Sequence, residues 1–179
     1  MAESFVNSVT RAVGVVTSSS AGAVGVQTNL ITGISTTNVT VGDIVDNSNY
    51  IAGTKVSSIG VNSTTVDRDS TNETAASSQT IKYLGLTTAY TSASGTKSII
   101  IGGTFANNTT SEVELTIHLY DNSSSTTPAI VSKVPVPNGS SFVLSDAGKT
   151  VLEGLDAIRV YCDTANAVDV QLGILKGVS

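Results

Sequence analysis

Cysteine, histidine and tryptophan are scarce in this sequence of 179 residues, and each scarcity argues against a class of functional site. The single cysteine, Cys162, has no partner for an intramolecular disulfide, so we expect a fold held by packing and made in a reducing cytoplasm. One cysteine and one histidine, His118, cannot supply the clustered ligands of a zinc site. The lack of tryptophan disfavours a glycosidase or lectin cleft, although five tyrosines leave a lectin-like role open.

Charged residues are scarce as well, at 13% of the chain, which is about half the usual share for a globular domain. The nine basic residues are scattered singly between Arg11 and Lys176, so no basic patch is available for nucleic acid or anionic lipid. The N-terminal residues lack the pattern of a signal peptide, and no apolar run has the length of a membrane helix. We therefore expect a soluble protein without nucleic-acid or membrane partners, able to leave its cell by lysis.

The spacing of apolar residues predicts an all-β fold. In residues 112–120 apolar side chains occupy every second position, and polar ones, His118 among them, occupy the others. Residues 99–105 form a second expected strand, with Ile99, Ile101 and Phe105 on one face. Further strands are expected at 130–136, 141–144, 158–163 and 168–174, with a turn at 137–139 and a short helical turn within 146–155. Together these predict an antiparallel β-sandwich of seven or eight strands over residues 86–179.

The first half of the chain is less regular, and we expect a small β-module over residues 29–85. Its expected strands are 43–45, 54–61, 63–67 and 80–84, with a β-bulge within 56–59 and an exposed loop at 69–78. Residues 1–28 are expected to form an N-terminal arm, in which 18–22 are a flexible turn or linker. Phe5, Val9 and Val13 have helical spacing, but the many β-branched residues disfavour a helix. The arm could also become ordered only on contact with a neighbour.

No catalytic, cofactor-binding or metal-ligating residues are predicted. His118 is interpreted as a surface histidine, and Cys162 as a buried core residue. Calcium needs only oxygen ligands, but the acidic residues lack the spacing of an EF-hand and are interpreted as turn residues. The residues weighed for calcium are Asp43, Asp46, Asp67, Asp69 and Glu73. Glu112 and Glu114, as candidate glycosidase carboxylates, are interpreted as the wet face of a strand.

Two stretches resemble a known class of proteins. Residues 41–45 read Val-Gly-Asp-Ile-Val, and residues 50–56 read Tyr-Ile-Ala-Gly-Thr-Lys-Val. This pattern resembles a β-module common in phage structural proteins and adhesins. The second half, with residues 136–141 and 168–175, resembles the β-sandwich that ends small virion proteins of tailed phages, and the whole chain is most similar to structural proteins of phages that infect cyanobacteria. The resemblance implies a component of the particle in capsid, neck or tail.

These observations lead to one preferred functional hypothesis. The chain is expected to be a non-enzymatic virion protein, a capsid decoration or cement protein that binds other virion proteins as a homo-oligomer. Its weakly charged, hydroxyl-rich surface suits repeated packing against like copies. Phe5, Val6, Val9 and Arg11 in the arm are the candidate contacts with the capsid. The alternative for these residues is a first strand or helix within their own domain, and the alternatives for function are a neck, tail or fibre component, a host-binding adhesin, or an enzyme.

Overall fold

The protein is built from β-strands throughout the part that the structure describes. The computed structural model describes residues 3–145 and 149–178, and every regular element within them is a strand. In chain order the strands are β1 (Ser4–Val13), β2 (Val16–Val24), β3 (Leu30–Thr32), β4 (Ile44–Asp46), β5 (Val56–Gly60), β6 (Ser63–Val66), β7 (Ala76–Leu84), β8 (Thr87–Thr91), β9 (Lys97–Asn107), β10 (Val113–Tyr120), β11 (Ala129–Val136), β12 (Ser141–Leu144), β13 (Thr150–Leu152), β14 (Ala157–Cys162) and β15 (Val168–Val178). The predicted all-β fold class is confirmed.

The strands form two compact units, and the chain leaves the first unit and later returns to it. One unit consists of β1 and the chain from Thr87 onward, and the other is Val15–Leu86. The expected arm of residues 1–28 is therefore not an arm, because its two halves are strand β1 of the first unit and strand β2 of the second. Within residues 86–179 the described strands are β8 to β15, and β1 joins them to complete the sandwich.

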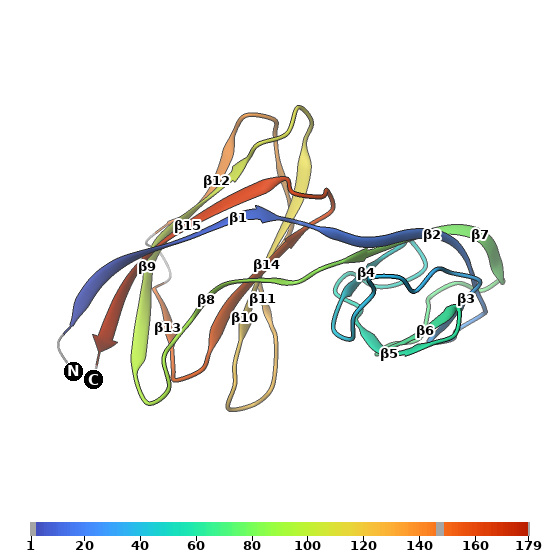
Figure 1. The fold of residues 1–179 in the computed structure, drawn as a ribbon, viewed down its shortest axis with the longest axis horizontal. Coiled ribbons are helices and arrows are strands. Elements are labelled where there is room, and N and C mark those ends of the chain that lie inside the picture. The colour runs from blue at the N-terminus through green and yellow to red at the C-terminus, as the bar shows by residue number, and fades with distance from the viewer. Residues whose placement is uncertain (1–2, 146–148, 179) are drawn as a thin grey trace. The chain divides into compact units, whose positions relative to one another are not determined.

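The first unit is a β-sandwich of two antiparallel sheets (Figure 1). One sheet has the order β1-β15-β9-β12, with β13 paired to the other half of β9, and the second has the order β11-β10-β14-β8. Strict alternation explains the packing, since inward side chains such as Leu115, Ile117 and Val160 are fully buried. The core also contains Val13, Ala89, Ile100, Phe105, Val113, Val136, Leu152, Ile158, Cys162, Ala167, Val168, Val170, Leu172 and Ile174.

A β-bulge in β9 overturns one detail of the sequence prediction. Gly173 of β15 pairs with Gly102 and the next residue, Ile174, pairs with Ile100, so Ile101 is an extra residue on β9. The extra residue reverses the alternation, so Phe105 is fully buried while Ile101 is exposed. The expectation that Ile99, Ile101 and Phe105 share one face is therefore wrong.

The second unit is a six-stranded antiparallel sheet that closes on itself. Its order is β4-β7-β2-β3-β6-β5, and backbone hydrogen bonds join the two ends of this order. The amide of Gly42 donates to the carbonyl of Val56 (2.9 Å), and the amide of Val45 donates to the carbonyl of Thr54 (2.8 Å). The strands thus enclose one core, as their ring in Figure 1 shows, which consists of Val24, Ile31, Ile34, Val39, Val45, Tyr50, Val56, Val66, Ile81 and Tyr83.

Residues 41–45 and 50–56, the two stretches that resemble a phage module, lie opposite each other where the two ends of the sheet meet and close it into a barrel. Asp43 is buried, and its carboxylate accepts hydrogen bonds from the amide and hydroxyl of Thr40, both at 2.8 Å. Thr54 is fully buried, and its hydroxyl donates to the carbonyl of Ile51 (2.7 Å). Both polar side chains therefore stabilise turns, and the motif specifies how the barrel closes.

Several local expectations can be compared with the structure. The bulge within 56–59 is present, as a register shift between Val56 and Ser58. Residues 18–22, expected as a turn or linker, lie inside β2, where their backbone pairs with β7. Gly22 is needed there, because a Cβ would lie 2.6 Å from a side-chain carbon of Ile34. The helical turn expected within 146–155 is partly replaced by β13, and residues 146–148 lie outside the described residues.

Candidate interaction face

The outer face of the sheet β1-β15-β9-β12/β13 is the candidate functional surface of the sandwich unit, and we call it the outer face. On β1 the alternation turns Phe5, Val9 and Arg11 outward. Phe5 is 77% exposed and Val9 is 67% exposed. Val6 points the other way and packs against the sandwich core, so it is not available as a surface contact.

Strand register arranges the outward side chains in rows across the sheet. The first row runs from Phe5 through Leu175 and Ile99 to Val151, so four strands each contribute an apolar residue. The second row is Val9, Gln171, Thr104 and Val143. The bulge adds Ile101 between the two rows. Neighbouring residues on a sheet face have Cβ atoms about 5 Å apart, so the apolar side chains of a row are in reach of one another.

A shallow hollow lies between the two rows. Here Asn7 pairs with Gly173, and Gly173 pairs with Gly102, so two adjacent strands carry no side chain on this side. The hollow is lined further by Phe5 and Ile101. The outer face therefore presents a large aromatic side chain next to a depression with a glycine floor.

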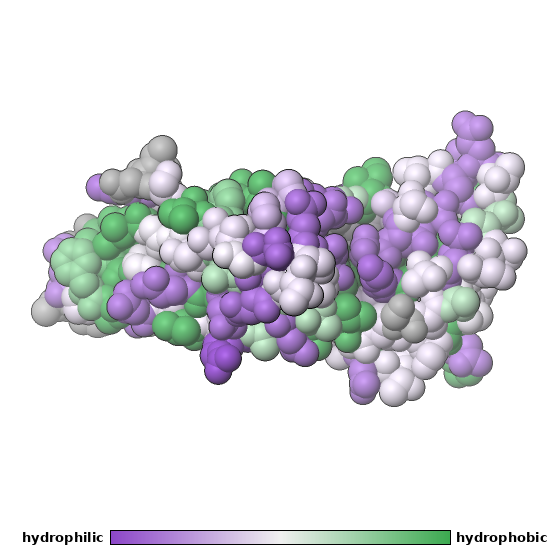
Figure 2. Space-filling model, turned by 90° about the horizontal axis from the view of Figure 1, so that it is seen from above, coloured by the Kyte–Doolittle hydropathy of each residue, from purple (hydrophilic) through white to green (hydrophobic). Residues whose placement is uncertain are grey.

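Charged side chains lie at the ends of the outer face. Arg11 forms an ion pair with Asp169 (3.5 Å) near one end, and Lys97 forms one with Glu153 (3.6 Å) near the other. Between them, residues 5–9, 99–104 and 171–175 contain no charged residue. Figure 2 shows apolar side chains on the visible surface of the molecule, interspersed with neutral and polar ones.

Of the four contact residues predicted from the sequence, three lie on the outer face. Phe5 and Val9 lie within the rows, and Arg11 is at the edge with Asp169 as a partner in its own chain. Sequence reasoning missed Ile99, Ile101, Val143, Val151 and Leu175, which belong to the same face. These residues are brought together by register between strands far apart in the sequence, which apolar alternation within one strand does not reveal.

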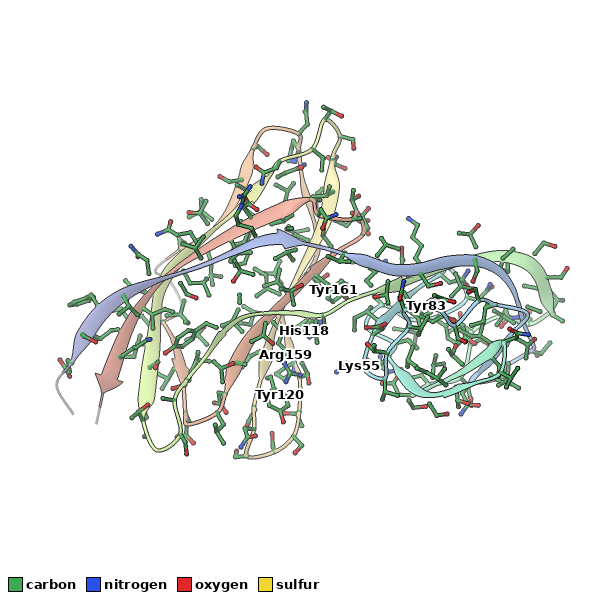
Figure 3. The ribbon with its side chains drawn as sticks, viewed as in Figure 1. Lys55, Tyr83, His118, Tyr120, Arg159 and Tyr161 are labelled. Atoms are coloured by element: carbon green, nitrogen blue, oxygen red, sulfur yellow. The ribbon has the colours of Figure 1, made fainter. Side chains whose placement is uncertain are left out.

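His118 lies on the other sheet, in a ladder of polar and aromatic side chains from β10 and β14 (Figure 3). Its ring stacks on that of Tyr161 at 5.6 Å, and its Nδ1 lies 3.0 Å from the carbonyl oxygen of Thr127. Arg159 places its guanidinium 3.9 Å from the ring centre of Tyr120. His118 is only 6% exposed, so its interpretation as a surface histidine is wrong. The alternation in the sequence predicted that this face of β10 is exposed to solvent, but neighbouring side chains such as Tyr161 cover the imidazole ring of His118.

Other residues considered as possible catalytic or metal-binding groups are buried in the core or bonded to neighbouring residues. Cys162 is fully buried as predicted, its thiol is 3.0 Å from the carbonyl oxygen of Thr164, and burial raises the pKa of the thiol. Asp67 accepts a hydrogen bond from the amide of Lys55 (2.8 Å), and Glu114 lies 3.7 Å from Lys133. Within residues 3–145 and 149–178, no group of three or more His, Cys, Asp or Glu is placed to hold a metal ion.

Comparisons with known proteins add no assignment. No protein-family model, curated protein or solved structure matches this chain. Across the residues that the structure describes, no helix has the length and apolar character needed to span a membrane.

Proposed function

We propose that this chain is a non-enzymatic structural protein of a tailed-phage virion, which binds the capsid surface as a decoration protein. The observation that carries the proposal is the outer face, an uncharged and partly apolar surface displayed on a paired sheet. Isolated soluble proteins seldom gather many exposed apolar side chains on one face, so the five on this face, Phe5, Val9, Ile101, Val143 and Val151, favour an interaction site. The proposal that the chain belongs to a virion is supported by the resemblance of residues 41–45 and 50–56 to a module of phage structural proteins.

The mechanism follows from the rigidity of the scaffold. Each strand of the outer face is hydrogen-bonded to its neighbours and backed by a close-packed core, so the backbone that carries the outward side chains is ordered without a partner. A preorganised face loses little conformational entropy on binding, which favours assembly from many identical weak contacts. Phe5 and Val9 supply apolar contact, while Arg11, already paired with Asp169, is the candidate for an edge contact with an acidic shell.

Quantitative mass spectrometry and imaging of purified particles test this proposal. A decoration protein is expected in hundreds of copies on the capsid surface, whereas a neck or tail component is expected in about six or twelve copies. The absence of the chain from particles would refute a virion role. Binding of the isolated chain to host cells or glycans, with no particle association, would instead support an adhesin.

A further inference from the structure

We infer that the outer face is the contact surface between two copies of this chain, related by a two-fold axis. This contact deepens the proposed function and rests on it: the outer face joins two copies of the decoration protein through Phe5 and Val9, and Arg11 at its edge remains the candidate for the contact with the capsid. The shape, area and charge of the face each favour a second copy over another occupant.

The shape of the outer face fits a copy of itself. Phe5 protrudes from β1, and the hollow floored by Gly102 and Gly173 lies one row away. A two-fold axis in the contact plane, midway between the two features, places Phe5 of each copy in the hollow of the other. Gly102 and Gly173 both line this hollow, and an added Cβ at either glycine would meet no atom closer than 3.4 Å, so the hollow has room for the end of a side chain from outside.

The area of the outer face approaches that of a dimer interface. β15 has 11 residues. β1 and β9 have 10 and 11 residues, and the short strands β12 and β13 add 4 and 3. With strands about 4.8 Å apart and a rise of about 3.4 Å per residue, the face presents roughly 640 Å². A stable interface covers about 800 Å² on each partner. Two sheets packed face to face, as in a β-sandwich, would cover the whole surface, whereas a single extended peptide would cover only part of it.

The charges of the outer face allow two identical surfaces to meet. Each end carries one positive and one negative side chain already paired, Arg11 with Asp169 and Lys97 with Glu153. The uncharged centre means that contact buries no unpaired charge and brings no like charges together. Nucleic acid or anionic lipid would instead select a positively charged face.

The test measures the oligomeric state of the full chain by sedimentation equilibrium over a range of concentrations. We expect a dimer for the unaltered chain. Val9→Glu places a charge on the outer face and is expected to raise the dimer dissociation constant on the order of a hundredfold. Val143→Glu, at the opposite margin of the same row, is expected to act in the same direction. Both side chains are exposed, so circular dichroism should show an intact fold.

Val61→Glu is the matched control, because Val61 is 93% exposed and lies in the barrel unit, at the turn between β5 and β6. It should leave dimerisation unchanged. An unaltered chain that is monomeric at every concentration, or equal weakening by Val61→Glu and Val9→Glu, would overturn the inference. Particle content is scored separately. A monomeric chain present in particles overturns only the dimer contact, while a dimer that is absent from particles overturns only the proposed function.

Discussion

Replacing Gly14 by alanine is expected to destabilise the sandwich by about 4 kcal/mol. Gly14 has φ of 89°, a conformation that costs an L-residue about 1–3 kcal/mol. An added Cβ would also overlap Sγ of Cys162 and the carbonyl oxygen of Thr164. The backbone oxygen cannot rotate away, so the end of β1 must shift, and overpacking of this kind costs about 1–3 kcal/mol. The sum is a large part of the roughly 5–15 kcal/mol that stabilises a domain.

Cys162 supplies the assay for this prediction, because it is the only cysteine and is fully buried in the sandwich. Thiol reagents attack the thiolate, and burial raises the pKa of this thiol, so the folded sandwich should react slowly. Thiol reactivity measured across a urea titration then reports unfolding of this unit. Gly95→Ala is the control, since Gly95 has φ of 72° but no atom near an added Cβ, and should cost about 1 kcal/mol. Equal losses in the two variants would refute the packing of Gly14 against Cys162.

Two further predictions concern a buried carboxylate and a buried phenol. Asp156 is 6% exposed, and its carboxylate accepts hydrogen bonds from the amides of Asn122 and Glu153, both at 2.9 Å. Asp156→Ala should therefore lower the free energy of unfolding, measured by thermal denaturation, by about 2–3 kcal/mol. Asp156→Asn should lower it less, and equal losses of stability in the two variants would contradict this role. Burial, with Tyr83 and Asp69 nearby, raises the pKa of Tyr50 from 10.0 to about 12. The unfolded chain therefore ionises first, and stability present below pH 10 is lost as the pH rises to about 12. Tyr50→Phe should reduce this loss in urea titrations at several pH values, and an unchanged pH dependence would contradict it.

Strands with strict alternation could be predicted from the sequence. Residues 112–120 match the bounds of β10 closely, and Val113, Leu115 and Ile117 are buried as the alternation predicts. On the polar face, however, His118 and Thr116 are buried as well. The bulge at Val56 and Ser58 could also be predicted, since apolar positions changed parity within a short segment. The bulge in β9 could not be predicted in this way, because residues 99–101 are all isoleucine and a change in the alternation of apolar and polar residues is not visible among them.

The candidate surface was only partly predictable. Phe5 and Val9 are apolar residues near the N-terminus, and their outward orientation follows from the pairing of β1 with β15. Nothing in the local sequence specifies that long-range partner, so the same residues were compatible with a helix, a strand or an arm. The prediction of a turn or linker at residues 18–22 was wrong for a similar reason. Their small side chains suggest a linker, but in β2 a small residue is required at Gly22 because the side chain of Ile34 packs against it.

The pairing of β1 with β15 has a consequence for synthesis on the ribosome. Ser4 of β1 pairs with Lys176 of β15, so β1 leaves the ribosome long before its partner strand has been synthesised. All strands of the barrel lie between them and emerge earlier, which allows this inserted unit to fold while β1 remains without its neighbour. Until β15 has been synthesised, the backbone groups of β1 that pair with it have no partner strand, and such an edge is open to premature association with other chains.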